Sequence, residues 1–174
     1  MNKLHDFKFN INEFNITPFF QSKEELRIRF GTEVFKGNIK TLEEIINYLF
    51  NRNEEIESTF IIGSKFNMQN EIKYNKIGLK SFFEITNWNE VLIESDDLEG
   101  TVVFATIGGL KPSGIFQYCK SIILGRIPQA YIMFYNNSFL LYISTDVLDI
   151  ISKKEEDIIA LKNNYSKIHT KYNA

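Results

Sequence analysis

The sequence predicts an α+β fold, a single domain of residues 1–174 in which helices pack on one face of a mainly antiparallel sheet. Segments with the two-residue period of strands are mixed along the chain with segments of helical period. A hairpin pattern lies near the C-terminal end. The 174 residues contain no repeat, no low-complexity tract and no interior linker, so they fit one domain.

The first predicted elements are a strand and a helix. In residues 26–30 apolar side chains alternate with two arginines, which is the period of a half-buried strand with a basic polar face. Thr41 and Glu44 have the spacing of a capping box, in which each side chain satisfies a backbone N–H at a helix start. Apolar residues then recur at helical spacing, so we expect a helix over residues 42–50.

The middle of the chain predicts two buried strands and a second helix. The segments "STFIIGS" and "GTVVFATIG" are short apolar runs rich in β-branched residues. Between them, "NEIKYNKIGL" is an amphipathic strand or a turn, and the remaining residues up to position 99 match no clear pattern. Further on, "GIFQYCKSIILG" has helical spacing, with Ser113 as a helix cap and Gly125 as a stop.

The C-terminal part predicts a hairpin and a last helix. The apolar runs "QAYIMFY" and "SFLLYIS" flank "NNS", in which asparagine tolerates the backbone conformation of a tight turn. We expect the final segment, from Lys153 to Tyr172, to form an amphipathic helix. Its expected apolar face consists of Ile158, Leu161, Tyr165, Ile168 and Tyr172.

Composition indicates a soluble protein that binds neither nucleic acid nor a membrane. The formal charge of −2 gives no strong field of one sign. The chain has no apolar run of the roughly 18 residues that a spanning helix needs. With Cys119 as the single cysteine no internal disulfide can form, and the first residues lack the apolar core of a signal peptide. We therefore expect a cytoplasmic protein.

Two further patterns argue against common active sites. Gly109 and Gly114 have the glycine spacing of a phosphate-binding loop, but Ile115 and Phe116 stand where such a loop needs lysine and a hydroxyl residue. A capped turn is the favoured interpretation, and an anion site near Lys111 is the alternative. The only thiol, Cys119, lies on an apolar helix face, and His169 lies in the last turns of the predicted final helix. A Cys/His dyad or a zinc site is therefore disfavoured.

The strongest binding candidate is the acidic run "ESDDLEG" together with the nearby Trp88. The carboxylates of Glu94, Asp96, Asp97 and Glu99 lack the spacing of an EF-hand. A solvated loop is the favoured interpretation, followed by a contact surface for a basic partner. The single tryptophan, Trp88, is either a core residue, which we favour, or an interface anchor.

Asp146 and Asp149 in "LYISTDVLDIIS" are a second candidate pair. Carboxylates three residues apart share one face of a helix and could bind a cation there, but on a strand they point to opposite faces. We expect Asp149 to stabilise the end of a strand or a turn, and Asp149→Ala to cost roughly 1 to 2 kcal/mol. Asp146 is expected to matter less.

The segment from "AYIMFYNNSFLLYISTDVLDIIS" to "LKNNYSKIHTKY" resembles a family of small, mostly Gram-positive bacterial proteins of unknown function. That family has a strand ending in Asp-Asp-Arg-Gly-x-Asp-Ile-Ile-Ala, then a helix with paired tyrosines. The match extends from Leu148 to Ser152, with Tyr165 and Tyr172 near the tyrosine positions, and "LRIRFG" is similar to the family's early strand. The chain departs from the motif at residues 144–147, which puts any role of those polar positions in doubt.

By analogy of size and composition, this resemblance implies a bacterial immunity protein, which binds and neutralises a cognate polymorphic or contact-dependent toxin. On this reading the chain is not an enzyme, needs no cofactor or metal, and binds a toxin domain through Trp88, Glu94, Asp96, Asp97 and Glu99. Two alternatives stay open. One is a metal-dependent enzyme that uses Asp146 and Asp149, and the other is a structural or regulatory dimer joined through the edge of the hairpin.

Overall fold

A computed structural model describes residues 2–51, 53–66, 69–97 and 99–171, and its centre is one antiparallel sheet. The strands are β1 (Arg27–Gly31), β2 (Glu57–Phe66), β3 (Lys73–Tyr74), β4 (Asn89–Ser95), β5 (Gly100–Ile107), β6 (Ile132–Tyr135), β7 (Phe139–Ile143) and β8 (Val147–Ser152). Their order in the sheet is β1-β8-β7-β6-β2-β5-β4, and β3 pairs with β2 beside this path.

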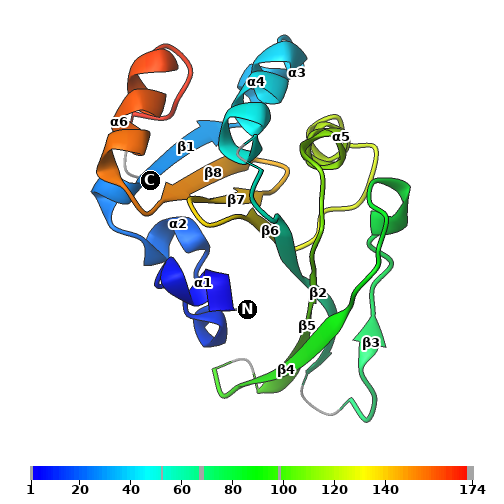
Figure 1. Ribbon diagram of the computed structural model, residues 1–174. Coiled ribbons are helices and arrows are strands. Elements are labelled where there is room, and N and C mark those ends of the chain that lie inside the picture. Colours follow the sequence, from blue (N-terminus) through cyan, green and yellow to red (C-terminus); the bar gives the residue numbers. More distant parts are fainter. Residues whose placement is uncertain (1, 52, 67–68, 98, 172–174) are drawn as a thin grey trace.

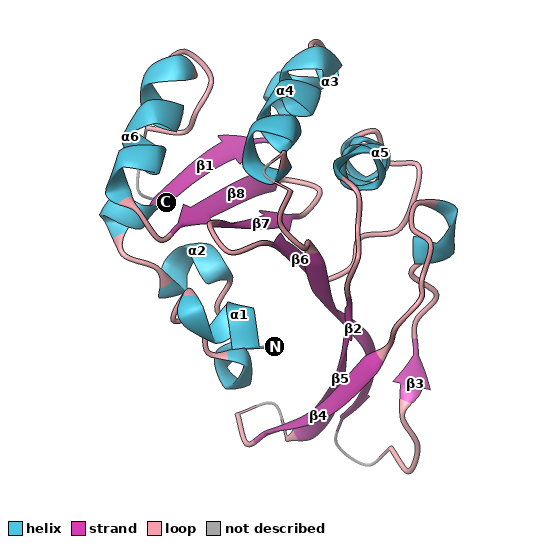
Figure 2. Ribbon diagram, in the orientation of Figure 1, coloured by secondary structure: helices cyan, strands magenta, loops and turns pink. Residues whose placement is uncertain are grey.

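Helices lie on both faces of the sheet (Figures 1 and 2). The α-helices are α1 (Asn2–Asp6), α2 (Pro18–Gln21), α3 (Glu33–Lys36), α4 (Ile39–Phe50), α5 (Pro112–Ile123) and α6 (Glu155–Asn164). Short 3₁₀ turns are η1 (Ile11–Glu13), η2 (Glu24–Leu26) and η3 (Leu79–Ser81). These elements confirm the predicted α+β class.

The main core lies between the sheet and the helices α3 to α6, as the predicted apolar stripes require. The opposite face of the sheet is also covered, which the sequence did not predict. There the N-terminal segment places Leu4, Phe7 and Phe9 against β6, β7 and β8, and Phe14 against β4 and β5. The helices of this segment are only four or five residues long, too short to show a helical period.

The helix boundaries differ from the predicted ones because other residues cap them. The side chain of Asn38 accepts a hydrogen bond from the Thr41 backbone N–H, so α4 begins at Ile39 and Thr41 lies inside it. At α5 the N-cap is Lys111, whose side chain makes no capping hydrogen bond, and Ser113 lies inside the helix. The last helix ends at Asn164 rather than near Tyr172, which lies outside the described residues.

The predicted hairpin is present as β6 and β7, but it lies inside the sheet. The Asn136 side chain closes its turn by accepting hydrogen bonds from the backbone N–H groups of Ser138 and Phe139. The other side of β6 pairs with β2, and the other side of β7 pairs with β8. Neither strand of the hairpin therefore has a free edge through which a second copy could pair. That the chain forms a dimer stays a prediction.

The two true edges of the sheet are β1 and β4. At β1 the chain near the C-terminus covers the strand, since the Thr170 backbone N–H donates to the Arg29 carbonyl at 2.8 Å and His169 forms a bridge with Phe30. At β4 no such cover is present among the residues that the structure describes. We therefore looked for the candidate site at the edge formed by β4.

Candidate functional site

Exposed apolar side chains gather along β4, in the part of the chain that the sequence left unassigned. Val91 and Ile93 face inward toward Phe14. Because side chains of a strand alternate between faces, Glu90, Leu92 and Glu94 point to the other side. Leu92 is 59% exposed, and Trp88, just before the strand, is 47% exposed. The expectation that Trp88 is a core residue is therefore wrong, and the alternative of an exposed anchor fits its position.

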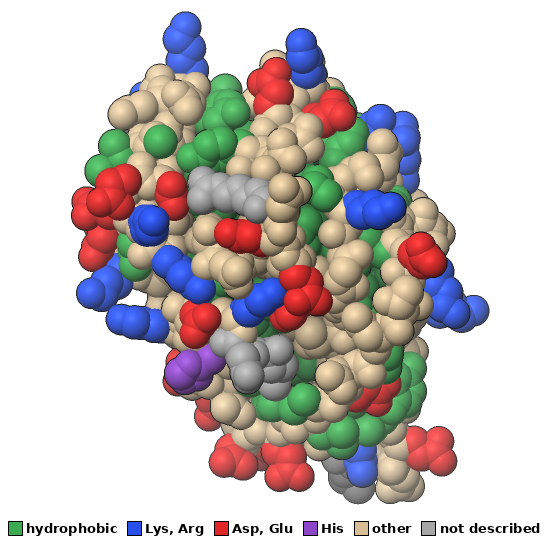
Figure 3. All heavy atoms as spheres, viewed as in Figure 1, with side chains coloured by type: hydrophobic (Ala, Val, Ile, Leu, Met, Phe, Trp, Pro, Cys, Tyr) green, Lys and Arg blue, Asp and Glu red, His purple; other side chains and the backbone are tan. Residues whose placement is uncertain are grey.

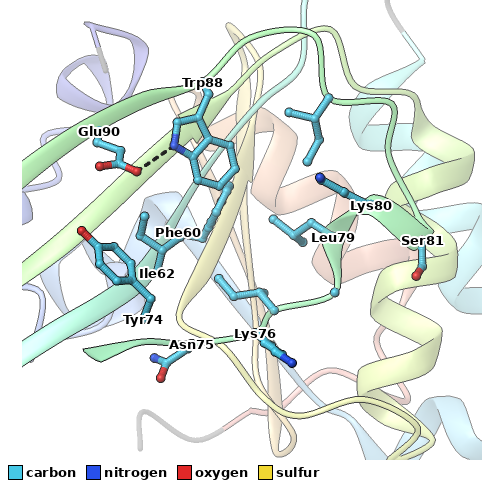
Figure 4. Close-up of a pocket in the computed structure, with 13 residues that line it drawn as sticks. Phe60, Ile62, Tyr74, Asn75, Lys76, Leu79, Lys80, Ser81, Trp88 and Glu90 are labelled. Carbon is cyan, nitrogen blue, oxygen red and sulfur yellow. Dashed lines mark hydrogen bonds between the residues drawn. The ribbon is translucent and has the colours of Figure 1, made fainter. Parts of the chain in front are cut away.

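Trp88 is exposed but held in place. Its ring packs edge-on against Phe60 of β2, with centroids 5.6 Å apart, and its indole Nε1 donates to Oε1 of Glu90 at 2.9 Å (Figure 4). Both contacts restrict the side-chain rotamers, so little further conformational entropy is lost when the indole meets another surface. Rigid aromatic side chains of this kind are frequent binding anchors.

A hollow of about 670 Å³ opens beside Trp88 (Figure 4). Its base is formed by Phe60 and Ile62 of β2, and its wall by Tyr74 of β3 and the following residues 75–81. This volume lies within the range of sites that hold small molecules or partner side chains. The lining is mostly apolar, and its polar residues are Asn75, Lys76, Lys80, Ser81 and Glu90.

Two glycines explain why the chain can form this hollow. A Cβ at Gly63 would lie 2.9 Å from the Lys73 carbonyl oxygen, so only glycine lets β3 approach β2 so closely. The Asn75 backbone N–H then donates to the Ile62 carbonyl at 2.7 Å, which fixes the start of the wall. Gly78 has φ of +70°, a conformation that favours glycine, and turns the chain into η3.

The predicted acidic residues lie at the far end of the same strand. Glu94 is in β4, and Asp96, Asp97 and Glu99 lie in the turn to β5, all of them exposed. Figure 3 shows acidic side chains projecting from this end of the molecule, beside hydrophobic ones over β4. None of these four carboxylates forms an ion pair with a described residue.

The structure therefore brings all five predicted partner-binding residues onto one edge of the sheet. Trp88 and Glu94 are six residues apart on an extended chain, which corresponds to about 20 Å. We call the exposed side chains along this line the β4 surface; its members are Trp88, Glu90, Leu92, Glu94, Asp96, Asp97 and Glu99. The sequence did not indicate Glu90 and Leu92 as members of this surface. In a regular amphipathic strand position 92 would be polar like positions 90 and 94, and the leucine there hides the strand pattern.

Asp146 and Asp149 do not form a pair in the structure. Asp149 lies in the middle of β8, not at a turn, and it is fully buried. Both of its carboxylate oxygens accept hydrogen bonds from Arg29 of β1, at 2.6 Å from Nε and 2.9 Å from Nη2. Asp146 is exposed in the loop between β7 and β8. The prediction that Asp149 matters for the architecture fits this geometry, but its place at a turn is wrong.

The Arg29–Asp149 ion pair joins the neighbouring strands β1 and β8, and the N-terminal segment packs over it. The guanidinium carbon of Arg29 lies 4.1 Å from the ring centroid of Phe19 in α2, which covers the pair. Burial raises the pKa of Asp149, and the hydrogen bonds and the positive charge of Arg29 oppose this shift. Since both carboxylate oxygens are engaged, the arrangement serves structure rather than ligand binding.

The other candidate groups lie apart from one another. Cys119 is fully buried in α5, and burial raises the pKa of its thiol far above its usual range. His169 lies beside β1 at the covered edge of the sheet. Gly114 is required for packing, because a Cβ there would lie 2.6 Å from the Phe82 carbonyl oxygen. Within the described ranges, no three His, Cys, Asp or Glu side chains are grouped as metal ligands would be.

Comparisons of the chain with models of protein families, with curated proteins and with solved structures give no match. The resemblance of residues 148–152 to a bacterial family of unknown function thus stays a prediction. No helix among the described residues has the length and apolar character needed to cross a membrane.

Proposed function

We propose that this protein is a cytoplasmic binding protein that recognises a basic protein partner through the β4 surface. Most concretely, we propose a bacterial immunity protein that binds a cognate toxin and neutralises it. The observation that carries the proposal is a pair of large exposed apolar side chains, Leu92 on the edge strand β4 and Trp88 just before it. Beside them lie the carboxylates of Glu94, Asp96, Asp97 and Glu99, which form no ion pair with a described residue. Exposed apolar groups with a polar surround are typical of protein interaction sites.

The two ends of the β4 surface differ in chemistry, and we assign apolar contact to one end and electrostatic attraction to the other. At one end, Trp88 and the adjacent hollow offer an anchor and a receptor for an apolar side chain. At the other end, the carboxylates between Glu94 and Glu99 attract a cationic protein over a distance of about a Debye length, near 8 Å at physiological salt. A partner with basic residues next to an apolar protrusion would match both ends of the β4 surface.

The proposal is tested with the product of any toxin-like gene beside the gene of this protein. We expect the two proteins to elute as one complex in size-exclusion chromatography, and cells that express the toxin to survive when this protein is co-expressed. The absence of both a complex and protection would count against the proposal.

A matched pair of variants locates the surface in the same experiment. Trp88→Ala/Leu92→Ser removes the two exposed apolar groups of the β4 surface, and we expect it to weaken the complex and the protection. Ile159→Ser removes an apolar side chain of α6 that is 48% exposed, and we expect it to change neither. Equal behaviour of the two variants would place the contact elsewhere.

A further inference from the structure

The uncovered edge of β4 offers backbone groups as well as side chains. From Asn89 to Ser95 the strand pairs with β5 without a bulge, and this pairing uses one side of its backbone. In the described chain, no backbone group of residues 89–94 bonds to any element other than β5. A strand edge in this state is a template on which a further strand can pair.

Edge strands in natural proteins are usually protected against such pairing by proline, lysine, a bulge or a covering segment. The opposite edge, β1, has a covering segment in the chain around His169 and Thr170. Residues 89–95 of β4 contain no proline and no lysine, and their register is continuous. What β4 does have is two exposed carboxylates, Glu90 and Glu94, on the same face as Leu92.

These two carboxylates determine which strand can pair. If a second copy paired antiparallel with β4 over the whole strand, Leu92 would lie opposite Leu92 of the other copy, and Glu90 would lie opposite Glu94 at both ends. Like charges directly opposite each other destabilise a strand pair, whereas opposite charges stabilise it. The pattern therefore disfavours self-association and favours a strand with an apolar residue flanked two positions away on each side by lysine or arginine.

We infer that β4 binds an extended segment of the partner by strand addition, with cationic side chains opposite Glu90 and Glu94 and an apolar side chain opposite Leu92. The segment would become a ninth strand of the eight-stranded sheet. This inference rests on the proposed function and adds the mode of binding and the chemistry of the partner segment to it.

A variant of this protein can serve as the cationic strand that tests the inference. The double substitution Glu90→Lys/Glu94→Lys turns β4 into a preformed strand with the pattern that the inference demands. Mixed with the unaltered protein at high micromolar concentration, this variant is expected to form a heterodimer in light scattering, while each protein alone stays monomeric. In the mixture, hydrogen exchange should slow at least tenfold at those backbone N–H groups of residues 89–94 in the unaltered protein that do not already bond to β5.

The control is Glu155→Lys/Glu156→Lys, which makes the same change of charge at exposed positions of α6. Mixed with the unaltered protein it should give no dimer and no protection of β4. Circular dichroism and melting temperature establish that both variants fold. A mixture that stays monomeric, or a dimer without protection of β4, overturns the inference. If the toxin complex still forms in that case, the mode of binding is wrong and the proposed function stands.

Discussion

Trp88 packs edge-on against Phe60 with ring centroids 5.6 Å apart, yet Trp88 is 47% exposed and Phe60 is fully buried. One ring of the pair belongs to the core, and the other belongs to the β4 surface. The core ring positions the exposed one, and the hydrogen bond to Glu90 fixes its orientation. Because Phe60 is buried and Trp88 is half exposed, mutation of each residue should affect stability to a different extent.

Trp88→Ala should cost much less stability than Phe60→Ala. Truncation of Phe60 removes a fully buried ring and should lower the free energy of unfolding by about 3 to 5 kcal/mol. Trp88 loses only its buried half, so we expect about 1 to 2 kcal/mol. Urea denaturation measures both. Equal losses would show that Trp88 is part of the core and would remove it as a binding anchor.

Asp96→Asn/Asp97→Asn should slow association with a basic partner without changing the fold. Exposed charges outside the buried contact act mainly on the association rate, and salt screens them. In stopped-flow measurements the rate should fall and should depend less on salt than in the unaltered protein. The control Glu155→Gln/Glu156→Gln removes the same charge from α6 and should leave the rate nearly unchanged. A similar drop in the control would indicate an effect of net charge alone.

Gly63→Ala should loosen the wall of the hollow, because its Cβ would lie 2.9 Å from the Lys73 carbonyl oxygen and force β3 away from β2. Overpacking of this kind costs about 1 to 3 kcal/mol. Faster hydrogen exchange of the Asn75 amide, which bonds to the Ile62 carbonyl, would report the change. Gly31→Ala is the control, since nothing lies within 4 Å of its added Cβ. Unchanged exchange at Asn75 in Gly63→Ala would contradict this account of the wall.

Asp149→Ala should destabilise the protein by about 3 to 5 kcal/mol, more than the sequence suggested, because it leaves the Arg29 guanidinium largely buried without its partner. Asp146→Ala, at an exposed loop position, should stay within about 0.5 kcal/mol. The double variant Arg29→Met/Asp149→Leu should recover much of the loss, since apolar side chains need no ion partner. Thermal denaturation distinguishes the three. A small effect of Asp149→Ala would mean that the ion pair contributes little.

The elements that the sequence predicts well are those with one buried and one exposed face. The strand with alternating arginines appears as β1, and the two central helices appear as α4 and α5 with ends shifted by a few residues. The hairpin is also correct, because Asn136 satisfies its turn locally. In each case the signal lies in the local sequence, either as a period that buries one face of the element or as a residue that closes its turn.

The elements that the sequence does not predict depend on contacts with distant parts of the chain. In β8, residues 148–152 are buried on both faces, so no alternation marks the strand, and Asp149 is tolerated only because Arg29, 120 positions away, meets it. At β4 the exposed Leu92 occupies a position where a regular alternation would have a polar residue, which hides the strand in the sequence. The acidic residues of the candidate site were predicted from composition, but their alignment with Trp88 along one edge required the structure.

The central claim, that the β4 surface binds a protein partner, is tested most directly by isothermal titration calorimetry. Three forms of this protein are titrated with the product of any toxin-like gene that lies beside its gene. We predict that the unaltered protein and Ile159→Ser bind with the same affinity, and that Trp88→Ala/Leu92→Ser binds at least about thirtyfold more weakly, as the loss of a binding hot spot of about 2 kcal/mol requires. Equal affinity of all three forms would contradict the claim.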